Sequence, residues 1–213
     1  MISNQSRGLT VVLFIVAILL LPAPARTQHK AFSGLYAGVE VGRQNLIGGS
    51  LVDNVDFLTQ DTRRVIALQG GVRYQFDVGF VIGVEGSVGF MDGKLSLADP
   101  ANQLDITYDN DQQTTFGLMS GFALGPRKRW LLFAYLSEAT RKFDVTVNRA
   151  GTTFQQSDEQ GFLRYGIGVE KQLFGHLNLR ATAGSGRADF ADRQTNIDVK
   201  REFEFSVGGV LQL

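Results

Sequence analysis

The feature that most constrains this chain is a two-residue alternation of apolar and polar or small side chains. It is clearest at the end of the chain, where Phe203 and Phe205 lie on one face and Glu204 and Ser206 on the other. Successive side chains of a β-strand point to opposite faces. The alternation therefore predicts a strand with one apolar face.

The same alternation recurs along the chain and predicts eight strands. The segments are 35–42, 66–75, 80–90, 115–124, 129–136, 163–170, 177–184 and 203–213. Each is close to the roughly ten residues that a tilted strand needs to cross a bilayer. An even number of strands lets both ends of a barrel finish on the same side of the membrane.

Segment 129–136 is apolar on both faces, so its alternation does not decide which face points outward. We assign Leu131, Phe133 and Tyr135 to the outward face. A buried helical turn is the alternative, and the neighbouring segments favour a strand.

The connections between the segments alternate in length. Three are short, at 77–79, 125–128 and 174–176. Four are long and rich in Asp, Asn, Gln, Thr and Gly, at about 44–61, 92–112, 144–160 and 187–199. Membrane barrels have short periplasmic turns and long external loops, whereas a soluble up-and-down barrel has no reason to alternate in this way. The pattern predicts an all-β, eight-stranded, antiparallel up-and-down transmembrane β-barrel.

The polar face of the strands is predicted to line the barrel lumen. Its charged residues are Glu40, Arg73, Glu85, Arg164, Glu170, Arg180 and Glu204. The interior of an eight-stranded barrel is filled by side chains, and buried charges of both signs must pair. We interpret these residues as a structural polar core, with a gate as the alternative. The main structural rival is a soluble, lipocalin-like barrel with its apolar face inside.

Aromatic residues near the strand ends predict two belts at the membrane interfaces. The expected turn-side belt is Phe76, Phe80, Trp130 and Phe174, and the loop-side belt is Phe90, Phe143, Phe162 and Phe203. The alternative is that aromatic residues simply favour strands. Lys171 falls on the outward face near a turn, where its ammonium group can reach the interface.

The N-terminal segment has the order of a secretory signal peptide. Arg7 is the only charged residue in the first 25, and the apolar run Leu9–Leu21 and the small residues Ala23 and Ala25 follow it. The run falls short of the roughly 20 residues of a spanning helix, although an uncleaved membrane anchor is the alternative. We expect cleavage within about three residues of Ala25.

The expected organisation is therefore a signal peptide at 1–25, an N-terminal lead-in at 26–33 and one barrel at 34–213. The chain has 21 basic and 21 acidic residues, which is not the basic excess that nucleic-acid binding requires. It has no cysteine, which excludes disulfides and thiolate metal sites and suits export. No cofactor is expected.

At this point the sequence resembles the small outer-membrane β-barrel proteins of Gram-negative bacteria, of the outer membrane protein A-like and opacity-protein-like kind. The resemblance is carried by Phe32–Gly42, by Tyr165–Glu170 and by the closing strand, and it covers residues 31–213. It implies the outer membrane as location, with membrane lipid, lipopolysaccharide and the assembly machinery as partners. Members usually end in an aromatic residue, and this chain ends in Leu213.

Some barrels of this kind modify lipid A with a histidine near the outer rim. This chain has two histidines: His29, beside the expected cleavage site, and His176, in a predicted periplasmic turn. Ser87 and Ser206 lie in strands without a nearby histidine, so no triad is predicted. Segment 105–111 has clustered oxygen ligands suited to calcium, but it lacks the EF-hand pattern, and a solvated acidic loop is favoured.

Three functions remain in order of preference. The first is a non-enzymatic, monomeric outer-membrane protein with a structural envelope role and exposed loops for adhesion or host contact. The alternative is a narrow, porin-like channel for small solutes or ions. The third is a lipid A-modifying enzyme. No catalytic, cofactor-binding or metal-binding residues are predicted.

Overall fold

The structure is a computed structural model that describes residues 30–52, 55–92, 94–99, 103–109, 112–149, 151–187 and 197–213. Ten strands make up this part of the chain. They are β1 (Gly34–Val52), β2 (Val55–Gln75), β3 (Phe80–Asp92), β4 (Lys94–Asp99), β5 (Leu104–Asp109), β6 (Gln112–Leu124), β7 (Trp130–Arg149), β8 (Thr152–Phe174), β9 (Leu177–Arg187) and β10 (Ile197–Gln212). Among the described residues, no helix is long and apolar enough to cross a membrane.

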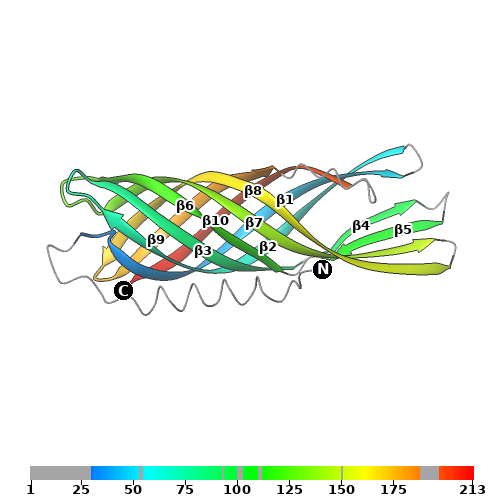
Figure 1. Cartoon of the computed structure of the whole chain (residues 1–213), viewed down its shortest axis with the longest axis horizontal. Helices are drawn as coiled ribbons and strands as arrows, with labels where there is room; N and C mark the ends of the chain where they lie inside the picture. Colours follow the sequence, from blue (N-terminus) through cyan, green and yellow to red (C-terminus); the bar gives the residue numbers. More distant parts are fainter. Residues whose placement is uncertain are drawn as a thin grey trace, which may run out of the picture.

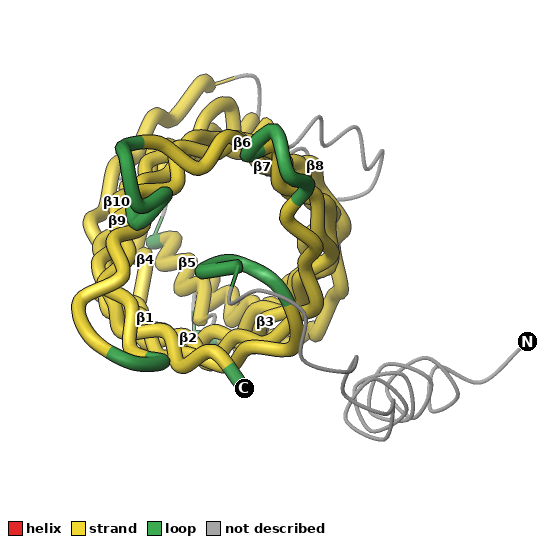
Figure 2. The backbone as a smooth tube through the Cα atoms, turned by 90° about the vertical axis from the view of Figure 1, so that its left-hand side faces the viewer, coloured by secondary structure: helices red, strands yellow, loops and turns green. Residues whose placement is uncertain are grey.

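Eight of these strands close into a barrel, and the predicted fold is confirmed. Each pairs antiparallel with the next, in the order β1, β2, β3, β6, β7, β8, β9, β10, and β10 returns to β1. The end-on view shows the closed ring (Figure 2). Closure gives every barrel strand two hydrogen-bonded neighbours, which is what a sheet needs in lipid because no water is present to satisfy the backbone.

The side chains of the barrel wall are arranged inside out relative to a soluble protein. Leu118 on β6 and Ile167 on β8 point outward and are 57% and 62% exposed. Arg73, Glu170 and Arg180 point into the lumen and are fully or almost fully buried. Exposed apolar and buried charged residues are expected where lipid surrounds the wall, so the lipocalin-like alternative does not describe this chain.

Strand β7 faces the opposite way to our prediction. Leu131 and Phe133 are buried in the lumen at 0% and 4% exposure, and Tyr135 also points inward, whereas Leu132 and Leu136 are about half exposed on the outside. The segment is a strand, as expected, but its outward assignment was wrong. Both faces are apolar, so the alternation carried no information about direction.

Glycines on neighbouring strands make room for these large inward side chains. A Cβ atom at Gly168 would clash with the Phe133 ring, and one at Gly184 would clash with the Tyr135 hydroxyl. Both would come closer than 3.0 Å, which real Cβ atoms essentially never do. The glycines of β8 and β9 therefore leave the space that lets Phe133 and Tyr135 of β7 point inward.

The long connections are more regular than the predicted loops. Strands β1 and β2 stay paired up to Val52 and Val55, and β7 and β8 up to Arg149 and Thr152. These hairpins project beyond the barrel at the end opposite the short turns (Figure 1). These outer parts are rich in Asp, Asn, Gln, Thr and Gly, which is why they were interpreted as loops, although β7 keeps a two-residue alternation over 143–148. Most of the fourth connection, at 188–196, lies outside the described residues.

Segment 92–112 contributes a separate hairpin. Strand β4 pairs with β5, and β5 continues onto the outer part of β7, where Leu104 lies opposite Arg149. The strands β4, β5, β7 and β8 form a four-stranded sheet at the loop end, which we call the outer sheet. Among the described residues, β4 is its edge and pairs with β5 alone.

Five of the eight aromatic residues of the predicted belts are exposed on the wall. Phe76, Trp130 and Phe174 are exposed near the turns, and Phe90 and Phe203 are exposed toward the loops. Phe80 is half-buried, with its ring 5.4 Å from that of Phe122. Phe162 instead points inward, where its ring lies 4.6 Å from the Arg141 guanidinium carbon. The side chain of Phe143 lies outside the described residues.

Candidate functional site

The lumen contains a buried ion pair near the turn end of the barrel. Arg73 on β2 donates from Nη1 to Glu170 Oε2 at 2.8 Å and from Nη2 to Glu170 Oε1 at 2.7 Å. Both side chains are completely buried. Arg73 also donates to the Gln212 side-chain oxygen at 2.6 and 3.1 Å. The paired donors of a guanidinium match a carboxylate in this two-point geometry, which fixes both groups.

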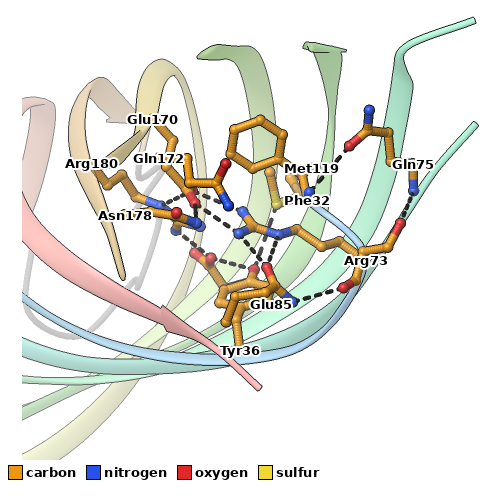
Figure 3. Close-up of polar contacts among 12 residues, drawn as sticks. Phe32, Tyr36, Arg73, Gln75, Glu85, Met119, Glu170, Gln172, Asn178 and Arg180 are labelled. Carbon is orange, nitrogen blue, oxygen red and sulfur yellow. Dashed lines mark hydrogen bonds and ion pairs between the residues drawn. The ribbon is translucent and has the colours of Figure 1, made fainter. Parts of the chain in front are cut away.

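A second arginine shares the same carboxylate. Arg180 on β9 donates from Nε to Glu170 Oε2 at 3.1 Å, and its Nη1 donates to Glu85 and lies 3.8 Å from Glu40 Oε1. Asn178 donates to Glu170 Oε1 at 2.6 Å. Figure 3 shows these side chains converging from several strands on the centre of the lumen.

Aromatic rings complete this cluster. Tyr36 donates its hydroxyl proton to Glu85 Oε2 at 2.6 Å. The guanidinium carbons of Arg73 and Arg180 lie 4.5 and 5.3 Å from the centre of its ring. Rings at this distance stabilise a cation through their negative faces, so the arginines are held by both carboxylates and rings.

The inner cluster has three acidic residues for two arginines. Its members are Glu40, Glu85, Glu170, Arg73 and Arg180. Neutral donors bind Glu40: Gln69 at 2.9 Å and Ser206 at 2.6 Å. Buried charges persist when opposite charges and hydrogen bonds replace their lost hydration, and each of the five has such partners here.

The N-terminal lead-in covers the turn end of this cluster. Phe32 is completely buried, its amide donates to Gln75 Oε1 at 3.1 Å, and its ring centre lies 5.2 Å from the Arg73 guanidinium carbon. Gln212 donates to the Ser33 carbonyl at 3.0 Å. The backbone before β1 is therefore attached to the same network.

The other two predicted lumen residues form a second cluster farther toward the loops. Arg164 on β8 and Glu204 on β10 form an ion pair, and Tyr135 donates to Glu204 Oε1 at 2.7 Å. The structure thus places all seven sequence-predicted residues in the lumen, in two groups. Glu40, Arg73, Glu85, Glu170 and Arg180 are in the first, and Arg164 and Glu204 are in the second.

Two buried arginines were missed by sequence reasoning. Arg63 and Arg141 are 1% exposed, and Arg141 donates to Gln113 Oε1 at 2.5 and 3.1 Å. Each continues the series of every second residue that points inward on its strand. Arg63 is two residues before Val65, and Arg141 is two residues after Ala139. Extending the alternation across the predicted strand ends would have found them.

A chamber of about 90 Å³, lined by both polar and apolar groups, lies within the lumen. Its lining includes Glu40, Glu85, Glu204, Thr182 and Ser206. The volume is large enough for several water molecules, and these side chains offer them hydrogen-bond partners. The buried Arg73, Glu170 and Phe32 lie between this chamber and the turn end, so their side chains occupy the lumen on that side.

The residues considered for catalysis or metal binding are not brought together. His176 lies in the turn between β8 and β9, while Ser87 shares a 2.6 Å hydrogen bond with Thr115 inside the barrel. His29 lies outside the described residues. Asp105 and Asp109 belong to strand β5 instead of a loop. Within the described ranges, no group of three acidic or histidine residues is placed to hold a metal ion.

Several solved structures are similar to this chain. The attachment invasion locus protein Ail of Yersinia pestis is 15% identical, with 83% of this chain and 97% of that chain covered and a TM-score of 0.49. Neisserial surface protein A is 13% identical, with 85% and 98% covered and a TM-score of 0.46. A major outer membrane protein of Thermus thermophilus is 14% identical, with 82% and 98% covered and a TM-score of 0.47.

The sequence itself carries the assignment to a family. No curated protein matches the chain significantly. The family model for the outer membrane protein beta-barrel domain matches residues 13–209, which is most of the chain. Together with the closed, inside-out barrel, this match establishes that the chain belongs to the outer membrane protein beta-barrel family and resides in the outer membrane.

Proposed function

We propose that this chain is a non-enzymatic outer-membrane protein that contacts partners outside the cell through its outer sheet. It is exported with residues 1–25 as a signal peptide, and its lumen charges act as a structural core. The observation that carries this proposal is the edge of β4, which among the described strands pairs with β5 alone. An exposed strand edge presents unpaired backbone groups to which an extended segment of another chain can add.

The charge of the outer sheet favours a basic partner. Segment 92–111 has five acidic residues and one lysine, and segment 144–160 has three acidic residues and one arginine. Asp105 and Asp144 are exposed on β5 and β7. Opposite charge accelerates encounter and excludes acidic competitors. The proposed partner is an extended, basic peptide segment of a protein at the cell surface.

The experiment compares intact cells that express the full chain, a variant lacking residues 95–108, and a D105N/D109N variant. The probe is a fluorescent peptide of alternating Lys and Val, with an alternating Glu and Val peptide as control. Binding of the basic peptide should depend on expression, disappear without the hairpin, and weaken in the Asn variant. Heat-modifiable gel migration and outer-membrane fractionation show that each barrel is assembled. Equal binding to cells with and without the hairpin contradicts the proposal.

A narrow channel is the second candidate, and the chamber in the lumen favours it. The buried Arg73–Glu170 pair and Phe32 oppose it, because they fill the lumen toward the turns. Planar-bilayer recordings of the purified chain distinguish the two functions. Reproducible single-channel conductance supports a channel, and its absence removes that candidate.

Modification of lipid A is the third candidate. Unchanged lipid A masses in cells that express the chain would remove it.

A further inference from the structure

Basic side chains gather at the turn end of the barrel. The exposed or half-buried charged residues described there are Lys30, Asp77, Arg127, Lys128, Arg129 and Lys171. Five of these six are basic, whereas the outer sheet at the opposite end is acidic. The family places the short turns in the periplasm, so the positive charge lies at the periplasmic surface of the membrane.

The one acidic residue of this group is already engaged. Lys30 Nζ lies 2.7 Å from Asp77 Oδ1. Lys128, in the turn between β6 and β7, donates to the backbone carbonyl of Asp77, in the turn between β2 and β3. Among the described residues, Arg127, Arg129 and Lys171 have no acidic partner.

Lys171 lies against an exposed indole, and Arg127 and Arg129 belong to the turn that leads into the same residue. Trp130 is 46% exposed, and Lys171 lies directly opposite it on β8, with Nζ 4.7 Å from the ring centre. Arg129 precedes Trp130, and its carbonyl accepts the Gln172 amide at 2.9 Å, which joins the turn to β8. The turn thus places the backbone of both arginines at the same end of the wall as the ring.

The other side of the indole borders the apolar wall. Leu124 lies opposite Trp130 on β6, and Leu132 and Val169 are the next outward residues on β7 and β8. All three are exposed. Trp favours the boundary between hydrocarbon and head groups, so the cations lie at the level of the lipid phosphates and the leucines at the level of the acyl chains.

We propose that Lys171 beside Trp130, with Arg127 and Arg129 of the adjoining turn, binds the phosphate of an anionic phospholipid in the periplasmic leaflet, with an acyl chain against Leu132 and Val169. The periplasmic leaflet consists of phospholipid, whereas lipopolysaccharide occupies the outer leaflet. A zwitterionic head group carries its own cation and gains less from the three basic residues. Each basic residue near an anionic surface strengthens binding roughly fivefold at low salt.

The single tryptophan makes this proposal measurable, because Trp130 is the only one in the chain. The full chain is reconstituted in phosphatidylcholine vesicles that contain a small fraction of either brominated phosphatidylglycerol or brominated phosphatidylcholine. Bromine quenches nearby indole fluorescence. We expect several-fold stronger quenching by the brominated phosphatidylglycerol, and this preference should decrease with salt. Equal quenching by the two lipids overturns the proposal.

Two variants separate the site from general charge effects. R127Q/R129Q leaves Lys171 over the indole and should lose most of the preference for phosphatidylglycerol. R43Q/R64Q removes two exposed arginines that lie opposite each other near the middle of β1 and β2, beside the loop-side end of β3, and it should keep the full preference. The assignment is contradicted if R127Q/R129Q keeps the preference for phosphatidylglycerol. It is also contradicted if R43Q/R64Q loses this preference to the same extent as R127Q/R129Q. Heat-modifiable migration shows that both variants are folded.

Discussion

The guanidinium of Arg73 and the carboxylate of Glu170 form two parallel hydrogen bonds, 2.7 and 2.8 Å long, across the lumen between strands β2 and β8. The two residues are 97 positions apart in the sequence. A two-point contact of this kind fixes the relative position of strands that are not neighbours in the wall. The lumen charges therefore hold opposite sides of the barrel together.

Removing both members of this pair should lower stability by less than the two single removals added together. We expect Glu170→Gln to lower the free energy of unfolding by about 3–5 kcal/mol, because it leaves the buried Arg73 and Arg180 without their shared carboxylate. The double variant R73M/E170M should lose clearly less than the sum of the two single variants. The measurement is urea unfolding in phospholipid vesicles, followed by Trp130 fluorescence. Additive losses within about 0.5 kcal/mol indicate that the pair is not coupled.

The inward-pointing side chain of Tyr135 should require a glycine at position 184. A methyl group at position 184 would meet the Tyr135 hydroxyl, and crowding of this kind costs about 1–3 kcal/mol. We expect Gly184→Ala to lower stability, and Y135F/G184A to recover part of the loss because the hydroxyl is gone. Gly209→Ala is the matched control, since no atom lies within 4 Å of the added carbon. Equal losses in Gly184→Ala and Gly209→Ala would count against this packing.

The alternation in the sequence predicted the direction of seven of the eight barrel strands, but β7 could not be predicted in this way. Its two faces, Leu131 with Phe133 and Leu132 with Leu136, are equally apolar. The information lies on other strands, where Gly168 and Gly184 leave space for large residues. Using it requires the strand register, which the sequence alone does not provide.

The charged lumen was predictable by residue but not by partner. The two-residue alternation alone assigns Arg73, Glu170 and Arg180 to the inward faces of their strands. Which of them meet depends on strand tilt and stagger, because side chains at one level of a barrel come from different positions along each strand. The outer sheet was missed for a different reason. Segment 92–112 was interpreted as a polar loop, although Leu104, Ile106 and Tyr108 alternate with polar residues along β5.

The contact between Lys30 of the lead-in and Asp77 of the barrel should break in acid. Hydrogen bonding to Lys30 lowers the pKa of Asp77, and the same contact raises the pKa of Lys30. A lowered carboxyl pKa means that the contact is complete above the usual Asp value and is lost as the pH falls through the lowered one. The raised pKa of Lys30 keeps it charged throughout that range.

The readout for this titration is the NMR shift of the Phe32 amide, which donates to Gln75. We expect one step below the usual Asp pKa in the wild type and no such step in Asp77→Asn. Trypsin should also cleave after Lys30 faster in Asp77→Asn at neutral pH. An unchanged cleavage rate would show that the ion pair does not hold the lead-in.

The central claim is that the wall presents apolar side chains to lipid and charged ones to the lumen, and β7 tests it most directly. The chain has no cysteine, so single cysteines at positions 131 to 136 can carry a spin label in reconstituted vesicles. We predict high collision rates with oxygen at positions 132, 134 and 136 and low rates at 131, 133 and 135. High rates at positions 131, 133 and 135 with low rates at 132, 134 and 136, or rates that show no two-residue period, would contradict the inside-out barrel.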